Sequence, residues 1–119
     1  MDEKREMELS RDRRLRRKLL HALRLANQIS PSGKLSGDFL RNEVRGFMRG
    51  EADFIDDEHA LDLLRSLVAS GYVEEKDERT RRGERWGLVN LMYRISEKGL
   101  RLLVEALPPD PLIEDERLG

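Results

Sequence analysis

Residues 60–75 have the sequence ALDLLRSLVASGYVEE, in which an apolar pattern of helical spacing leads into a glycine and then into an extended segment. The pattern predicts one buried stripe, formed by Leu61, Leu64, Leu67 and Val68. Gly71 is expected just past the end of this helix, because glycine readily adopts the left-handed conformation needed there. With Asp56 or Asp57 as N-cap, a helix is predicted to continue to about Ser70.

Downstream, the sequence predicts a β-hairpin followed by a last helix. YVEEKDE at 72–78 and WGLVNLMYRIS at 86–96 are typical of paired strands. In the second strand one face is expected to hold Val89, Leu91, Tyr93 and Ile95, which alternate with Leu88, Asn90, Met92 and Arg94. Ser96 is expected to cap the last helix, which Pro108 and Pro109 should end. Its apolar stripe would be Leu100, Leu103, Val104 and Leu107.

Upstream, two more helices and a very short strand are predicted. The first helix lies in 11–28, where Ser10 can serve as N-cap, and the acidic residues before it leave open an earlier start. Its buried stripe would be Leu15, Leu19, Ala22, Leu23 and Ala26, opposite Arg13, Arg17 and Arg24. A strand fits only at 34–36. The second helix is predicted at 38–48, capped by Ser36 and presenting Phe39, Leu40, Val44, Phe47 and Met48.

Composition predicts one highly charged domain. The chain has 119 residues, of which 39% are charged against about 25% on average, and a net charge of −1. That balance hides an asymmetry, because residues 11–24 are strongly basic and residues 105–119 are strongly acidic. With no cysteine, disulfides and zinc-thiolate sites are excluded. No long apolar stretch and no apolar leader occur, so we expect a cytoplasmic protein with no membrane contact.

The element order resembles that of a winged helix-turn-helix domain, in which a β-hairpin wing follows the third helix. The most specific stretches are 60–75 and YRISEKGLRLL at 93–103. The second is similar to MarR-like and PadR-like regulators in its aromatic, hydroxyl, glycine and leucine positions, which are Tyr93, Ser96, Gly99 and Leu103. The resemblance implies a mostly helical α+β fold: a three-helix bundle with a hairpin wing and a C-terminal helix. Residues 11–107 would form this domain, after an extension at 1–10 and before an acidic flexible tail at 108–119.

The resemblance also implies duplex DNA binding and transcriptional regulation, with the third helix in the major groove and the wing on the backbone or minor groove. The third helix departs from this pattern, because it carries Asp56, Asp57, Glu58 and Asp62, against the more favourable His59, Arg65 and Ser66. Phosphate contacts are therefore expected mainly from the wing arginines, joined by two cations near the second and third helices: Arg79, Arg81, Arg82, Arg85, Lys34 and Arg65. The alternative for the arginine-rich loop is a solvated hairpin tip beside acidic neighbours.

Other surfaces leave alternatives open. The basic face of the first helix could be solvated, follow a DNA backbone, dock an acidic surface, or pair with the chain's own acidic tail in the same molecule or in a dimer mate. Its members are Arg13, Arg14, Arg16, Arg17, Lys18, His21 and Arg24. A homodimer through the first and last helices is a further expectation. The alternative function is a winged-helix module that docks an unknown protein partner without binding DNA.

Catalysis finds little support in the sequence. Asp56, Glu58, His59 and Asp62 are ligand types for a hard divalent ion, but carboxylates also favour a helix N-terminus through its dipole. No glycine-rich phosphate loop or nucleophile elbow occurs. We therefore expect no enzyme activity, no cofactor and no bound metal. Trp86 could stack on a base, although packing over the root of the hairpin is the commoner outcome for such an aromatic residue.

Overall fold

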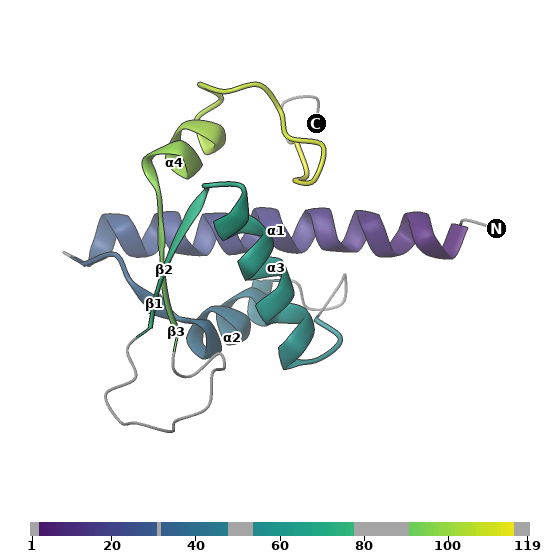
Figure 1. The fold of residues 1–119 in the computed structure, drawn as a ribbon, viewed down its shortest axis with the longest axis horizontal. Helices are drawn as coiled ribbons and strands as arrows, with labels where there is room; N and C mark the ends of the chain where they lie inside the picture. The colour runs from purple at the N-terminus through teal and green to yellow at the C-terminus, as the bar shows by residue number, and fades with distance from the viewer. Residues whose placement is uncertain (1–2, 31, 48–53, 78–90, 116–119) are drawn as a thin grey trace.

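The structure, a computed structural model, describes residues 3–30, 32–47, 54–77 and 91–115. Figure 1 shows its elements, which are α1 (Glu3–Ile29), β1 (Leu35–Ser36), α2 (Gly37–Phe47), α3 (Asp57–Ala69), β2 (Val73–Asp77), β3 (Leu91–Ile95) and α4 (Glu97–Leu103). The predicted α+β, mostly helical class is confirmed. Among the described helices, none is long and apolar enough to cross a membrane.

The three strands form one antiparallel sheet in the order β1-β3-β2. Its central strand, β3, has the predicted alternation over the described residues: one face is buried, with Leu91, Tyr93 and Ile95, whereas Arg94 is exposed. Alternate residues of a strand point to the same side, so these three share one face. Strand β3 packs on α1. Residues 86–90, which the sequence also assigned to this strand, lie outside the described residues.

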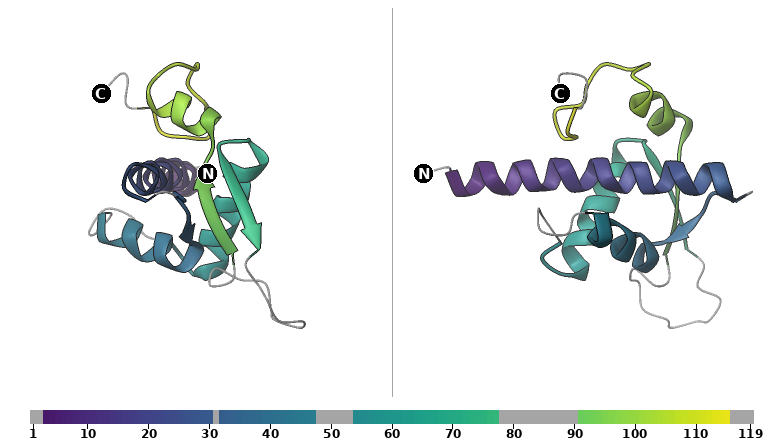
Figure 2. Two further views of the ribbon diagram at one scale, coloured as in Figure 1. Left: turned by 90° about the vertical axis from the view of Figure 1, so that its left-hand side faces the viewer. Right: turned by 180° about the vertical axis from the view of Figure 1, so that it is seen from behind.

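Helix α1 is the centre of the fold. Figure 2 shows it between α2 on one side and α4 with the chain that follows on the other. All five residues of its predicted stripe are buried, and Leu20 joins them. The helix begins at Glu3, so the longer of the two predicted starts is the observed one. Arg17, expected on the solvent side, is only 7% exposed because the C-terminal residues cover that side of α1.

Helix α3 begins and ends as predicted. The Asp56 side chain accepts a hydrogen bond from the backbone N–H of His59 at 2.8 Å. Gly71 has φ +84°, and the bonds from Gly71 N to Val68 O and from Tyr72 N to Leu67 O, both 3.0 Å, make a Schellman motif. The buried residues are Ala60, Leu63, Leu64 and Leu67, whereas Leu61 and Val68 are half-buried. The stripe differs from the prediction because α1, α2 and β2 contact the helix from several sides.

Helix α2 is capped as predicted, since the N–H of Phe39 donates to Ser36 Oγ at 3.1 Å. Leu40 and Val44 are fully buried. The prediction for Phe39 was wrong: its side chain is 50% exposed, because the helix turns one narrow face to the core. The side chain of Phe47 and all of Met48 lie outside the described residues.

The two stretches with the most specific family resemblance meet at the start of α4. Ser96 caps this helix, accepting from the N–H of Gly99 at 3.1 Å, and its own hydroxyl donates to Gly71 O at 2.6 Å. The N–H of Ser96 donates to Tyr72 O at 2.9 Å. Gly99 packs directly on that carbonyl, where an added Cβ would lie 2.3 Å from the oxygen. The turn after α3 therefore fixes the position of α4.

Helix α4 is shorter than predicted. It ends at Leu103, before the prolines, because Glu105 adopts φ 62° and Ala106 N bonds to Arg101 O at 2.8 Å. This second Schellman motif closes the helix without glycine. Val104, expected in the buried stripe, is consequently exposed.

The chain after α4 also differs from the prediction of a flexible acidic tail from residue 108. Residues 109–115, here the C-terminal strap, pack along α1, and Ile113 is 3% exposed in the core. Glu114 N bonds to Arg13 O at 3.2 Å, and the Tyr72 hydroxyl donates to Asp110 Oδ2 at 2.7 Å. Only residues 116–119 of the predicted tail lie outside the described residues.

Alkaline pH should destabilise the fold through two tyrosines. Tyr72 donates to Asp110, and Tyr93 donates to Glu75 Oε2 at 2.8 Å. Burial, followed by these hydrogen bonds and negative charges, raises the pKa of Tyr72 to about 12 and raises that of Tyr93 also. Because the unfolded chain ionises first, near pH 10, the stabilisation is complete below that pH and is lost as pH rises toward 12.

Urea unfolding at about pH 9 and about pH 11 measures this loss. The parent midpoint should fall between the two, and the Tyr72→Phe, Tyr93→Phe double variant should fall less. The double variant controls for titration of lysines over the same interval. Equal losses in both proteins would contradict the assignment.

Candidate nucleic-acid interface

The paired strands β2 and β3 define the hairpin that the sequence predicted as a wing. Their register runs from Val73 opposite Ile95 to Asp77 opposite Leu91, so the connection 78–90 leaves and re-enters the sheet at one end. The four arginines expected to contact phosphate, Arg79, Arg81, Arg82 and Arg85, belong to that connection. They lie outside the described residues, as does Trp86, and their roles stay predictions.

The two remaining predicted contact residues lie around Tyr93, near the base of the hairpin. Lys34 and Tyr93 line one hollow of 280 Å³. Arg65 is exposed on α3, and its positive charge acts on the Tyr93 hydroxyl, lowering its pKa against the larger effect of burial. Lys34 is half-buried and already has an interaction partner. The structure therefore brings Lys34 and Arg65 to the same region of the domain.

The same hollow reveals two cations that were not assigned to the interface from the sequence. Its other lining residues are Glu74, Glu75, Lys76, Met92 and Arg94. Lys76 and Arg94 are exposed and accompany Lys34, while Glu74 and Glu75 add negative charge. Strand alternation could have identified Arg94, since it points away from the buried face of β3.

The exposed surface of α3 is acidic, as the sequence indicated. Glu58 and Asp62 are exposed one turn apart on α3, and the exposed Arg65 follows them. Of the three residues considered favourable for DNA, Ser66 is engaged internally: its hydroxyl donates to Leu63 O at 2.7 Å and accepts from Arg16 Nε at 2.9 Å. Arg65 is thus the exposed cation that α3 can present to a DNA groove.

His59 is engaged internally as well. Its Nδ1 accepts from the N–H of Ile55 at 3.0 Å, so Nε2 carries the proton and donates to Asp12 Oδ1 at 2.9 Å. Asp56 caps the helix, and Asp57 pairs with Arg41, which also pairs with Asp38. Within the described part of the chain, no three histidines or carboxylates are grouped to hold a metal ion. The acidic start of α3 therefore acts as a helix cap and as a contact to α2, whereas His59 makes the contact to α1.

Part of the basic face of α1 is occupied by the chain's own C-terminal strap. Arg14 Nε lies 3.3 Å from Glu114 Oε2, and Arg16 Nη1 donates to Leu112 O at 3.0 Å. Arg17 donates to His21 Nε2 at 3.1 Å and to Glu114 O at 3.4 Å. Burial lowers the pKa of Arg16, against the opposing charges of Asp12 and Asp110. Of the alternatives raised by the sequence, pairing with the acidic tail in the same molecule is the one observed.

Comparison with known proteins adds no neighbour, since no protein-family model, curated protein or solved structure matches this chain. Inferences about function therefore depend on the chain's own geometry. That geometry consists of an antiparallel hairpin after α3, cations at its base, an acidic α3 surface and a basic helix partly covered by the strap.

Proposed function

We propose that this chain is a winged helix-turn-helix domain that binds duplex DNA, mainly through phosphate contacts from its hairpin, and acts in transcriptional regulation. The observation that carries the proposal is the antiparallel β2/β3 pair directly after α3, whose connection contains Arg79, Arg81, Arg82 and Arg85. Arginine side chains suit this role because they neutralise phosphates and enter narrow minor grooves. A cytoplasmic location and the lack of any catalytic step or cofactor belong to the same proposal.

The charge distribution supports contact by the hairpin rather than by α3. Glu58 and Asp62 would face phosphates with like charge if α3 entered the major groove. At the hairpin base, by contrast, the three cations Lys34, Lys76 and Arg94 outnumber Glu74 and Glu75, and Arg65 lies nearby. Binding of this kind recognises the backbone and carries little sequence information.

Salt dependence of DNA binding tests the proposal. Replacing all four arginines of the connection with alanine should weaken binding to a mixed-sequence duplex. Each lost phosphate contact removes about 0.9 from the slope of log K against log salt, so the slope should flatten by about 3.6. The melting temperature should be nearly unchanged. Fluorescence anisotropy between about 20 and 200 mM salt measures both affinity and slope.

A matched control removes positive charge far from the hairpin. Lys4, Arg5 and Arg101 are exposed, and their triple alanine variant should keep nearly the parental slope. If the parent binds the duplex and the hairpin variant binds it with the same affinity, the hairpin does not make the DNA contact.

A second candidate function is a docking module for another protein that does not contact DNA. Two observations favour it: the exposed acidic residues of α3 and the use of the α1 arginines by the strap. A mobility-shift assay of the parent protein with duplex DNA discriminates between the two functions. Absence of any mobility shift with duplex DNA at about 20 mM salt would favour docking, because sequence-independent binding is strongest at low salt.

A further inference from the structure

The first turns of α1 extend beyond the rest of the fold. Figure 1 shows the N-terminal part of α1 projecting past the other described elements. Residues 3–10 are all exposed, including the apolar side chains of Met7 at 72% and Leu9 at 51%. Such a segment gains little packing from the described residues of its own chain, although most helical stability in proteins comes from a packed face. We call residues 3–10 the α1 overhang.

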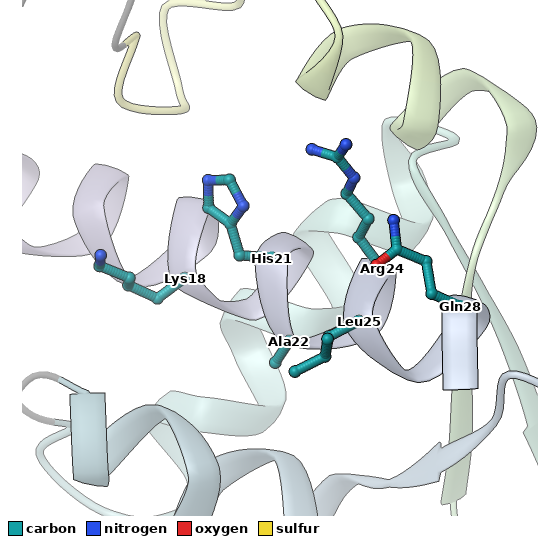
Figure 3. Close-up of a pocket in the computed structure, with 6 residues that line it drawn as sticks. All are labelled: Lys18, His21, Ala22, Arg24, Leu25 and Gln28. Atoms are coloured by element: carbon teal, nitrogen blue, oxygen red, sulfur yellow. The ribbon is translucent and has the colours of Figure 1, made fainter. Parts of the chain in front are cut away.

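The other end of the same helix carries an open hollow. Its volume is 350 Å³, and its lining residues are Lys18, His21, Ala22, Arg24, Leu25 and Gln28. Figure 3 shows His21 and Arg24 projecting to the same side of α1, with Ala22 and Leu25 below them. Leu25 is 48% exposed. The hollow thus combines an apolar floor with a positively charged rim.

The overhang and the hollow lie on one face of α1. Met7 and Leu25 are separated by about five turns at 3.6 residues per turn, so they point in the same direction. A second copy related by a two-fold axis at the level of residue 16, on the Met7 and Leu25 side of the helix and opposite the Arg16 side chain, would run antiparallel to the first. Met7 would then lie on Leu25 of the partner subunit. In this register Glu6 comes beside the partner's Arg24, and Glu3 comes beside the partner's Gln28.

We propose that two copies of this chain pair through antiparallel α1 helices, with the overhang of each copy lying in the hollow of the other. The pairing is independent of the proposed DNA binding. It also differs from the dimer expected from the sequence, because α4 makes no part of it. In this register the overhang brings Glu6 to the Arg24 on the rim of the partner's hollow, so each end of the interface has a pair of opposite charges.

The middle of the interface has the opposite character. Lys18 faces Arg14 of the partner subunit in this register, and two like charges at a contact are unfavourable. Glu114, which pairs with Arg14 at 3.3 Å, compensates only in part. This feature distinguishes a second copy from any acidic ligand, because Lys18→Glu should strengthen the pairing of two copies and weaken binding of an acidic ligand.

Sedimentation equilibrium of the full chain from about 1 μM to 1 mM tests the pairing. The parent should approach twice its 13.9 kDa mass. Leu25→Glu should raise the dimer Kd about 100-fold, because two apolar contacts are lost per dimer. Arg24→Glu should raise it about tenfold, and Glu6→Arg in the same chain should restore it. Lys18→Glu should lower it about tenfold.

Leu112→Glu serves as a matched control, since Leu112 is equally exposed but lies on the strap, and its Kd should equal the parent's. Circular dichroism of each variant checks that the fold is retained. A parent that stays at 13.9 kDa up to about 1 mM overturns the proposal. So does a Lys18→Glu variant that dimerises more weakly, or an Arg24→Glu variant with the parental Kd.

Discussion

Replacing Gly99 with alanine should lower the free energy of unfolding by about 3 kcal/mol and the melting temperature by about 10 °C. The new Cβ would lie 2.3 Å from Tyr72 O and 2.7 Å from Ile95 Cγ1. Neither neighbour can move easily. Tyr72 O accepts a 2.9 Å hydrogen bond from Ser96 N, and Ile95 is buried in the central strand. Relief of the clash would therefore require α4 to separate from the turn after α3.

A second glycine provides the control for this prediction. Gly46 is the penultimate residue of α2, and a Cβ added there meets no atom of the described residues within 4 Å. Gly46→Ala should therefore stabilise the protein by about 0.5 kcal/mol, because alanine loses less backbone entropy than glycine in a helix. Thermal unfolding of both variants beside the parent measures the difference. If Gly99→Ala melts within about 2 °C of the parent, the packing of α4 on Tyr72 is not as described.

Gly99 also illustrates what the sequence could predict. Local signals such as Asp56, Ser96 and Gly71 located helix ends correctly, because caps depend on hydrogen bonds within a few residues. The stripe of α1 and the alternation of β3 were correct for a similar reason, since one-sided burial leaves a periodic pattern. The sequence singled out Gly99 only through the family resemblance. Glycine is required there because the backbone packs against Tyr72 O, which is a tertiary contact.

Features that depend on distant partners were not predictable in this way. Arg17 fits a solvated basic face by its spacing, and only the strap, far away in sequence, buries it. Phe39 fits an apolar stripe until α2 turns it outward. The end of α4 was placed at the prolines, since no sequence rule indicates that Glu105 adopts a left-handed conformation.

In the candidate interface, too, local features could be predicted from the sequence and contacts between distant residues could not. The hairpin and the acidity of α3 could be predicted, because strand alternation and charge are visible in the sequence. The internal use of His59 and Ser66 could not, since each bonds to a residue of α1. Those two contacts leave Arg65 as the exposed cation of α3, and the proposal therefore assigns most phosphate contacts to the hairpin.

The second large effect is expected at the strap. Replacing Ile113 with alanine should lower the free energy of unfolding by about 3 kcal/mol, the usual cost of truncating a fully buried isoleucine. Ile113 is 3% exposed, belongs to the core, and lies beside Leu102 and Arg17. The loss should exceed the transfer term alone, because the same segment positions the carbonyls of Leu112 and Glu114 that accept hydrogen bonds from Arg16 and Arg17.

Urea unfolding of Ile113→Ala beside Leu112→Ala isolates this contribution. Leu112 is adjacent, half exposed and of the same size, so its truncation should change stability by less than about 0.5 kcal/mol. The two substitutions leave the charge of the strap unchanged, and any difference between them reports burial. A flexible tail, as the acidic composition suggested, would make both variants equal to the parent. A strap packed on α1 requires them to differ, and it makes residues 109–115 part of the folding unit rather than an appendage to it.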